Sequence, residues 1–161
     1  LRSVRGQLSW AEAEPGRPLD AIVCREGYVT PARDGRHIVG ATFQRDDADL
    51  NPRDEDDETN RWRLGRLVPG WGDQPLTSAR VSVRAATPDR LPLVGALAPG
   101  LFASLGHGSR GLTCAPLGGE LLASMVCGEP LPLPRDLVRR LDPLRFGDVT
   151  SHPARVNMSD D

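Results

Sequence analysis

Short apolar segments alternate with polar, glycine- and proline-containing stretches along the first part of the chain, a pattern typical of β-strands joined by turns. Strands are predicted where β-branched and aromatic residues gather between glycines and prolines. They cover residues 3–10, 19–25, 28–31 and 36–43, and further along the chain 80–86, 91–95 and 101–105. Between two of these segments, Asp34-Gly35 predicts a tight hairpin turn.

Three helices are predicted, mostly in the second half. Asn51 is expected to cap the first, with Pro52 at its first helical position and an acidic start facing solvent. The second covers 111–127 and ends at Gly128, and the third covers 135–141 after a proline-rich linker. Strands followed by helices predict an α+β fold with a mostly antiparallel or mixed sheet. From about Gly147 a polar tail is expected to be poorly ordered.

Composition narrows the class of protein. The chain has 161 residues, 39% of them hydrophobic, so it can build a core of its own. No apolar run approaches the roughly 20 residues of a membrane span, and a net charge of -2 argues against a whole-surface nucleic-acid binder. Three scattered cysteines and three histidines lack metal-ligand spacing, so we expect no metal and a reducing, cytoplasmic location. All 20 basic residues are arginines, whose planar forks suit carboxylates and phosphates.

Residues 106–111, Gly-His-Gly-Ser-Arg-Gly, follow a predicted strand and open a predicted helix. Their glycine spacing matches a dinucleotide-binding fingerprint. That fingerprint needs a second parallel strand about 20 residues further on, and the proline-rich linker occupies this place. Two interpretations remain, a purely structural turn or a helix start that faces an anionic ligand.

Several longer segments resemble one protein family. Residues 83–95 (VRAATPDRLPLVG) and the segment GHGSRGLTCAPLGGELLAS from Gly106 resemble the FAD-dependent amine oxidoreductases, the superfamily of D-amino-acid, glycine and sarcosine oxidases. Adding VRGQ, GYVTP and IVGATF, the match is strongest to the oxidoreductase half of bifunctional enzymes that modify the wobble uridine of tRNA. It runs in order from about Arg5 to about Leu144.

The resemblance implies the substrate-facing sheet and last flavin-contacting helix of a D-amino-acid-oxidase-like fold. We expect residues 1–146 to be a fragment of that oxidoreductase domain and 147–161 a tail. The implied partners are an N-terminal Rossmann unit that holds FAD, a methyltransferase domain in the same parent chain, and tRNA as substrate. Without the Rossmann unit, the fragment is expected to be inactive and to bind FAD weakly or not at all.

The resemblance also implies roles for individual residues. Arg84 matches a carboxylate-binding arginine, and Tyr28 matches a pocket tyrosine that orients the substrate; the alternatives are a sheet-edge ion pair and ordinary aromatic packing. The turn into the long helix is expected to contact the flavin. The positions involved are Gly106, His107, Gly108, Ser109, Arg110, Gly111 and Leu112.

The implied reaction oxidises the carboxymethylamino group of the uridine, giving aminomethyl-uridine and glyoxylate. Two alternatives stay open. One is a small-molecule amine oxidase that acts on glycine, sarcosine or D-amino acids. The other is a non-catalytic module whose glycine turn holds an anion or a partner.

Overall fold

The computed structural model describes residues 1–147, which form two compact units. The sheet unit comprises Ser3–Arg84. The hairpin–helix unit comprises Leu1–Arg2 and the described residues from Ala85 to Gly147. The predicted tail lies almost entirely outside the described residues.

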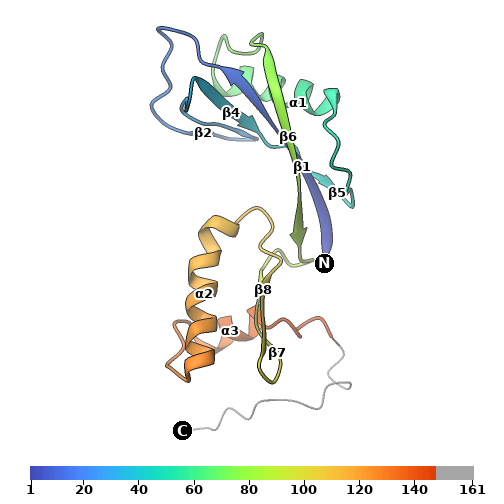
Figure 1. Cartoon of the computed structure of the whole chain (residues 1–161), viewed down its shortest axis with the longest axis vertical. Helices are drawn as coiled ribbons and strands as arrows, with labels where there is room; N and C mark the ends of the chain where they lie inside the picture. The colour runs from blue at the N-terminus through green and yellow to red at the C-terminus, as the bar shows by residue number, and fades with distance from the viewer. Residues whose placement is uncertain (148–161) are drawn as a thin grey trace. The chain divides into compact units, whose positions relative to one another are not determined.

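In the sheet unit the strands pair in the order β2-β3-β4-β1-β5, and β6 also pairs with β1 (Figure 1). The pairs β2–β3, β3–β4, β4–β1 and β1–β5 are antiparallel, which agrees with the predicted α+β class. The strands are β1 (Arg2–Glu12), β2 (Val23–Cys24), β3 (Tyr28–Val29), β4 (Arg36–Gly40), β5 (Gln44–Arg45) and β6 (Leu76–Ala86).

The predicted hairpin turn is confirmed between β3 and β4. Arg33 and Arg36 exchange backbone hydrogen bonds of 2.9 and 3.1 Å. Asp34 and Gly35 both have positive φ, 52° and 76°. Two central residues with positive φ match the twist of antiparallel strands, which is why Asp-Gly is favoured here.

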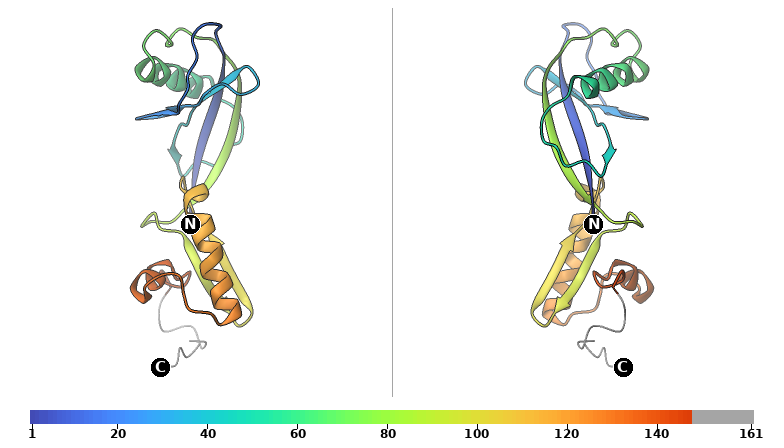
Figure 2. Two further views of the ribbon diagram at one scale, coloured as in Figure 1. Left: turned by 90° about the vertical axis from the view of Figure 1, so that its left-hand side faces the viewer. Right: turned by 90° about the vertical axis from the view of Figure 1, so that its right-hand side faces the viewer.

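The helix α1 (Asp54–Leu67) lies against β3 and β4 (Figure 2). Its predicted start at Asn51 is wrong, because Arg53 occupies the N-cap position. The side-chain amide of Asn51 donates to the carboxylate of Asp49 at 2.7 Å, and the backbone carbonyl of Asn51 accepts a hydrogen bond from Arg5. The side-chain NH₂ and the backbone of Asn51 are therefore engaged outside the helix.

The prediction that the acidic helix start faces solvent is also wrong in part. The buried residues of α1 are Asp56, Asn60 and Leu64, which are spaced four apart and so share one face. Only Leu64 of these joins the apolar core, which it forms with Ala11, Val29, Val39 and Trp71. The helix thus packs on the sheet through a largely polar stripe.

The two faces of the sheet differ, as alternation along β1 shows. Arg5, Gln7, Ser9 and Ala11 are fully buried on the face that α1 covers. Successive side chains of a strand point to opposite faces, so Gly6, Leu8 and Trp10 belong to the other face. We call this second side the open face.

The hairpin–helix unit consists of an antiparallel pair with two helices. The strands β7 (Leu93–Ala98) and β8 (Leu101–Leu105) pair from Leu93↔Leu105 onward. The helix α2 (Gly111–Cys127) runs along this hairpin, and α3 (Arg135–Leu141) contacts β7 (Figures 1 and 2). Both helices have their predicted bounds, and Gly128 ends α2 in the left-handed conformation with φ of 70°.

Candidate functional site

Arg84 lies over the open face of the sheet unit, with its guanidinium against the backbone of Gly6. A Cβ atom placed on Gly6 would lie 2.2 Å from Nη1 of Arg84 and 2.7 Å from its Cζ. The ring of Phe43 stands 5.9 Å from the same guanidinium carbon, within the range of a cation–π contact. At Gly6, therefore, no side chain separates the guanidinium from the backbone of β1, and an aromatic ring lies nearby.

One nitrogen of this guanidinium has no acceptor. Nη1 of Arg84 is buried and makes no hydrogen bond within the described part of the chain. A buried donor without a partner costs free energy, about 1–3 kcal/mol and more when it is charged. An anion that offered two oxygens to the fork would remove this cost, and a carboxylate has the matching geometry.

Tyr28 lies on the same face, on β3, with β4 between it and β1. In the strand registers Tyr28 stands opposite Gly40, and Gly40 opposite Leu8. Directly opposed residues share a face, and Leu8 shares its face with Gly6. Burial raises the pKa of Tyr28 above 10.0, while the positive charge of Arg84 lowers it. The structure thus brings the two predicted substrate residues to one face, close enough to interact electrostatically.

Sequence reasoning missed Gly6 and Phe43 as members of this group. A glycine inside a strand is a signal of close approach by another group, so Gly6 offered a clue. Phe43 follows β4 in the sequence and is 53% exposed. Nothing in its local pattern distinguished it from other aromatic residues.

The predicted cofactor residues lie in the hairpin–helix unit, in the turn between β8 and α2. Gly106 and Gly108 have φ of 71° and 55°, a region that glycine adopts without strain. The N–H of Gly108 donates to the carbonyl of Ala85 at 3.0 Å, which ties the turn to the end of β6. A Cβ on Gly108 would meet nothing within 4 Å, so the backbone there is open to a ligand.

The start of α2 completes this turn. Arg110 is the N-cap residue, and no side chain caps the helix, so its first N–H groups are available to an acceptor. Ser109 and Arg110 are exposed, and Leu112 is 98% exposed. Gly111 opens the helix itself. An open backbone, uncapped N–H groups and an exposed leucine fit the edge of a flat, partly anionic ring system.

His107 faces a different way from the open backbone of the turn. Its Nε2 lies 3.0 Å from Oγ of Ser104, and its ring carbon would be 3.8 Å from a Cβ on Gly118. Nδ1 is buried and has no hydrogen-bond partner among the described residues. The imidazole therefore packs between the hairpin and α2.

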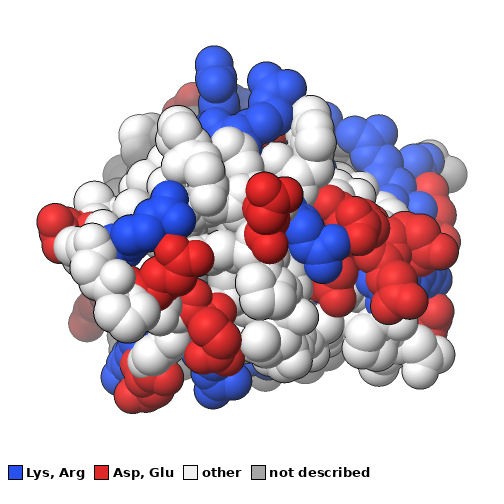
Figure 3. All heavy atoms as spheres, turned by 90° about the horizontal axis from the view of Figure 1, so that it is seen from above, with Lys and Arg blue, Asp and Glu red and all other residues white. Residues whose placement is uncertain are grey.

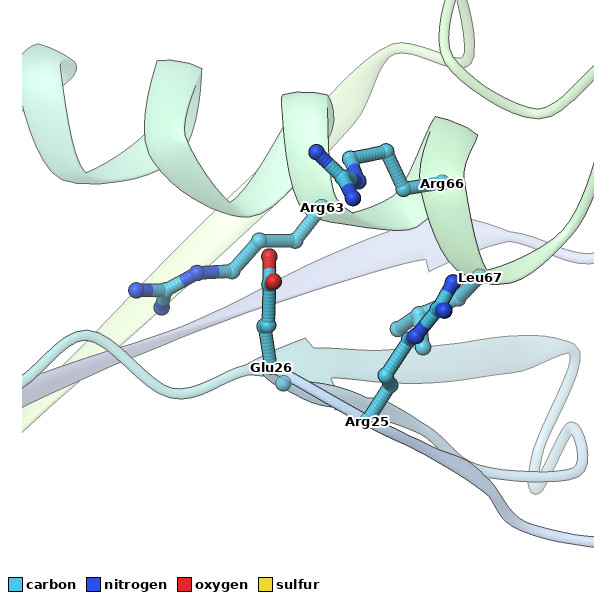
Figure 4. Close-up of a pocket in the computed structure, with 6 residues that line it drawn as sticks. Arg25, Glu26, Arg63, Arg66 and Leu67 are labelled. Atoms are coloured by element: carbon cyan, nitrogen blue, oxygen red, sulfur yellow. The ribbon is translucent and has the colours of Figure 1, made fainter.

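A separate shallow hollow lies between the β2–β3 turn and the end of α1 (Figure 4). Arg25, Arg63 and Arg66 line it together with Glu26, whose carboxylate points toward α1. Nη1 of Arg63 donates to the carbonyl of Ala41 at 2.9 Å. On the face seen in Figure 3, acidic side chains also lie among basic ones. None of the predicted site residues lines this hollow.

Residues 1–125 match the sequence profile of a protein family described as FAD-dependent oxidoreductase. The chain belongs to the FAD-dependent oxidoreductase family. This membership confirms the predicted enzyme class and identifies FAD as the cofactor of the family. None of the described helices has the length and apolar character to cross a membrane.

The curated relatives of this oxidoreductase chain are much longer proteins. It is 43% identical to the tRNA 5-methylaminomethyl-2-thiouridine biosynthesis bifunctional protein MnmC of Aromatoleum aromaticum, over 91% of this chain and 26% of the relative. The protein of the same name from an Azoarcus species is also 43% identical, over 99% of this chain and 28% of the relative. The chain thus spans about a quarter of their length, and the predicted resemblance is confirmed.

Solved structures confirm the predicted fold class. Glycine oxidase from Geobacillus kaustophilus matches 89% of this chain and 39% of its own with a TM-score of 0.77, at 24% identity. Iminodiacetate oxidase from Chelativorans matches 88% of this chain and 39% of its own with a TM-score of 0.73, at 29% identity. The α+β arrangement is that of the glycine-oxidase-like enzymes.

Proposed function

We propose that this chain supplies the carboxylate-binding and flavin-contacting residues of an oxidoreductase that acts on tRNA. The reaction removes the carboxymethyl group from carboxymethylaminomethyl-(thio)uridine at the wobble position and leaves aminomethyl-(thio)uridine and glyoxylate. Relatives at 43% identity that are named for tRNA 5-methylaminomethyl-2-thiouridine biosynthesis support this substrate. The observation that carries the proposal is the buried, unpartnered Nη1 of Arg84.

The chemistry balances as a two-electron oxidation followed by hydrolysis. The carbon between the secondary amine and the carboxylate loses a hydride and the nitrogen loses a proton, which forms a C=N bond. Water then adds to this carbon and the C–N bond breaks, so that glyoxylate and the primary amine separate. Bound FAD would accept the two electrons with the hydrogen.

Arg84 has the task of holding the substrate carboxylate. Its fork offers two parallel N–H donors to the two carboxylate oxygens, an arrangement that fixes orientation as well as position. Tyr28 sits on the same face with a pKa raised by burial, so its hydroxyl stays protonated at neutral pH and can donate a hydrogen bond. Together the two side chains would orient the amine-bearing carbon for oxidation.

The turn between β8 and α2 has the task of stabilising the flavin. Uncapped N–H groups at a helix start favour negative charge, which develops on a flavin when it is reduced. We assign this contact to residues 106–112, whose backbone is open at Gly108. Arg110 and Ser109 would add a fork and a hydroxyl to the same contact.

The remaining partners follow from this function. An N-terminal Rossmann unit would hold the adenosine and pyrophosphate of FAD, and a methyltransferase domain would belong to the same parent chain. The relatives' names describe bifunctional proteins, which supports a second domain. A tRNA substrate places the enzyme in the cytoplasm.

The decisive experiment uses the complete flavin-loaded protein that contains this chain, with tRNA carrying carboxymethylaminomethyl-uridine. Mass spectrometry of the nucleosides and trapping of glyoxylate measure the products. Arg84→Lys keeps the positive charge but removes the fork, and Arg33→Lys makes the same chemical change in an exposed turn. We expect Arg84→Lys to lower kcat/KM about ten- to a hundredfold, chiefly through KM, because a hydrogen bond to a charged group contributes about 1.5–3 kcal/mol.

Arg33→Lys should leave kcat/KM unchanged. If Arg84→Lys also leaves it unchanged, the carboxylate role of Arg84 is wrong. If the wild-type protein forms no glyoxylate from the tRNA, the proposed reaction is wrong.

A second candidate function is oxidation of a small amino acid, which the structural match to glycine oxidase favours. The same residues would serve, because glycine carries the same amine and carboxylate. Assays with glycine, sarcosine and D-amino acids discriminate the two, since oxidation of these free amino acids in place of the tRNA would select this candidate.

A further inference from the structure

We propose that Gly6 is a positioning residue. Because it has no side chain, it leaves a space on β1 that the guanidinium of Arg84 occupies, and this space, which we call the seat, fixes the orientation of the fork. This inference rests on the proposed carboxylate-binding role of Arg84. It adds that the strand beneath the arginine helps to determine how the carboxylate of the substrate is held.

Space, rather than backbone conformation, explains the glycine. Gly6 is buried within β1 and is absent from the glycines with positive φ. Any residue can adopt its backbone angles, so conformational freedom does not require glycine there. An added Cβ, however, would lie 2.2, 2.6 and 2.7 Å from Nη1, Nη2 and Cζ of Arg84. These separations are far below the roughly 3.5–4.0 Å of an unstrained contact.

The same face contains a second seat of this kind, which serves a different purpose. A Cβ on Gly40 would lie 2.6 Å from Cδ2 of Leu8. Gly40 thus accommodates an apolar side chain, whereas Gly6 accommodates a charged one. Only the seat at Gly6 bears on the orientation of a hydrogen-bonding group.

The backbone of β1 cannot yield to relieve a clash, because its other face is anchored. Arg5 and Gln7, the neighbours of Gly6, are both fully buried. Arg5 donates to the carbonyl of Asp49 at 2.8 Å, and Gln7 donates through Nε2 to Asp57 at 2.9 Å. The N–H of Gln7 also donates to Oγ1 of Thr42 at 2.9 Å. With the strand held on both sides of position 6, the guanidinium must move instead.

Movement of the fork would weaken binding of a carboxylate. Two parallel hydrogen bonds require both nitrogens to face both oxygens, so a displacement of about 1 Å breaks the match. Gly6→Ala is therefore expected to act on the substrate without touching it.

The test compares Gly6→Ala in two backgrounds of the complete flavin-loaded protein, wild type and Arg84→Ala. Direct binding uses methoxyacetate, whose ether oxygen replaces the amine so that the probe keeps the carboxylate but resists oxidation. Kd for this probe, kcat and KM for the modified tRNA, and Tm are measured. Gly119→Ala is the matched control, because a Cβ at Gly119 in α2 would meet nothing within 4 Å.

In the wild-type background we expect Gly6→Ala to raise Kd for methoxyacetate about tenfold or more, with KM rising and kcat changing less. In the Arg84→Ala background the side chain over Gly6 is gone, so the same substitution should change Kd less than about twofold. Gly119→Ala should change neither. Tm should fall with Gly6→Ala only where Arg84 is present, which keeps the test decisive if the single variant folds poorly.

The outcomes separate the two proposals. If Arg84→Ala alone leaves Kd and KM unchanged, the carboxylate role of Arg84 fails and the inference on Gly6 fails with it. If Arg84→Ala weakens binding but Gly6→Ala does not, the seat is wrong while the role of Arg84 stands. Equal effects of Gly6→Ala in both backgrounds would also overturn the seat, since they would show a general structural defect.

Discussion

Arg5 and Asp56 form an ion pair that is buried between β1 and α1. The guanidinium of Arg5 is fully buried, and the exposed fraction of the Asp56 side chain is only 3%. The same guanidinium also donates to the backbone carbonyls of Asp49 and Asn51. One arginine thus joins the strand, the helix start and the loop that connects them.

Asp56→Asn should destabilise the sheet unit strongly. The substitution leaves the charge of Arg5 buried with no ionic partner in this pair, and breaking a buried pair costs about 3–5 kcal/mol. Urea unfolding followed by tryptophan fluorescence measures the change. Glu58→Gln is the control, because Glu58 pairs with Arg61 at 2.5 Å but is 71% exposed; it should cost at most about 1 kcal/mol. Equal effects of the two substitutions would show that burial of the pair has no energetic role.

Asp89 and Arg145 should make the hairpin–helix unit sensitive to acid. Arg145 donates to both carboxylate oxygens of Asp89 at 2.9 Å, and this lowers the pKa of Asp89 well below 3.8. The pair therefore stabilises the fold above pH 3.8, and its contribution is lost as the pH falls through the lowered pKa. Since Asp89 is about one third exposed, the contribution is at most about 1 kcal/mol.

Thermal unfolding just above and well below pH 3.8 measures this effect. Asp89→Asn should remove that part of the acid-induced fall in Tm which comes from the pair. If wild type and variant lose the same Tm on acidification, Asp89 is not an acid-sensitive group of the fold.

The titration of Tyr28 reports on the open face without interference, because Tyr28 is the only tyrosine of the chain. Burial raises its pKa above 10.0, and the charge of Arg84 opposes that rise. Ultraviolet titration of tyrosinate in the folded chain should therefore give a midpoint above 10.0, and a higher one in Arg84→Ala. The raised pKa contributes stability below pH 10.0 that is lost as the pH rises through it. A midpoint unaffected by Arg84→Ala would show that the charge of Arg84 does not act on the hydroxyl of Tyr28.

Gly108→Ala should weaken FAD binding in the complete protein. Gly108 and Gly100 both have positive φ, 55° and 72°, and a Cβ on either would meet nothing within 4 Å. The two alanine variants therefore carry similar backbone strain, about 1–2 kcal/mol. Only the methyl group at position 108 would meet the flavin, so only this variant should raise Kd for FAD, by about tenfold. Flavin fluorescence measures Kd, and a similar Kd for both variants would contradict the cofactor role of the turn.

Local signals predicted much of the fold. The hairpin at Asp34-Gly35 and the bounds of α2 and α3 depend on turn and cap residues adjacent in sequence, and the structure confirms them. β1 and β6 extend beyond their predicted ranges, since pairing with a distant strand, rather than local propensity, determines their length.

Interactions between distant residues explain what the sequence did not predict. The polar stripe of α1 is buried because residues about fifty positions earlier in the chain satisfy it. Arg5 pairs with Asp56, and the backbone carbonyl of Gln7 and the hydroxyl of Ser9 both accept hydrogen bonds from the side-chain amide of Asn60. Hydrophobic periodicity cannot reveal such a face. The placement of Arg84 over Gly6 likewise depends on the pairing of β6 with β1. The functional role predicted for Arg84 came from resemblance, and its surroundings came only from the structure.

Alternation along β1 has a practical consequence for engineering. Odd-numbered positions from Arg5 to Ala11 hold the strand to α1, whereas the even-numbered positions from Gly6 to Trp10 belong to the opposite side. Mutational libraries intended to change substrate preference can therefore be restricted to alternate codons of one short stretch. The intervening codons are the ones to leave fixed, so that loss of expression does not mask a gain in selectivity.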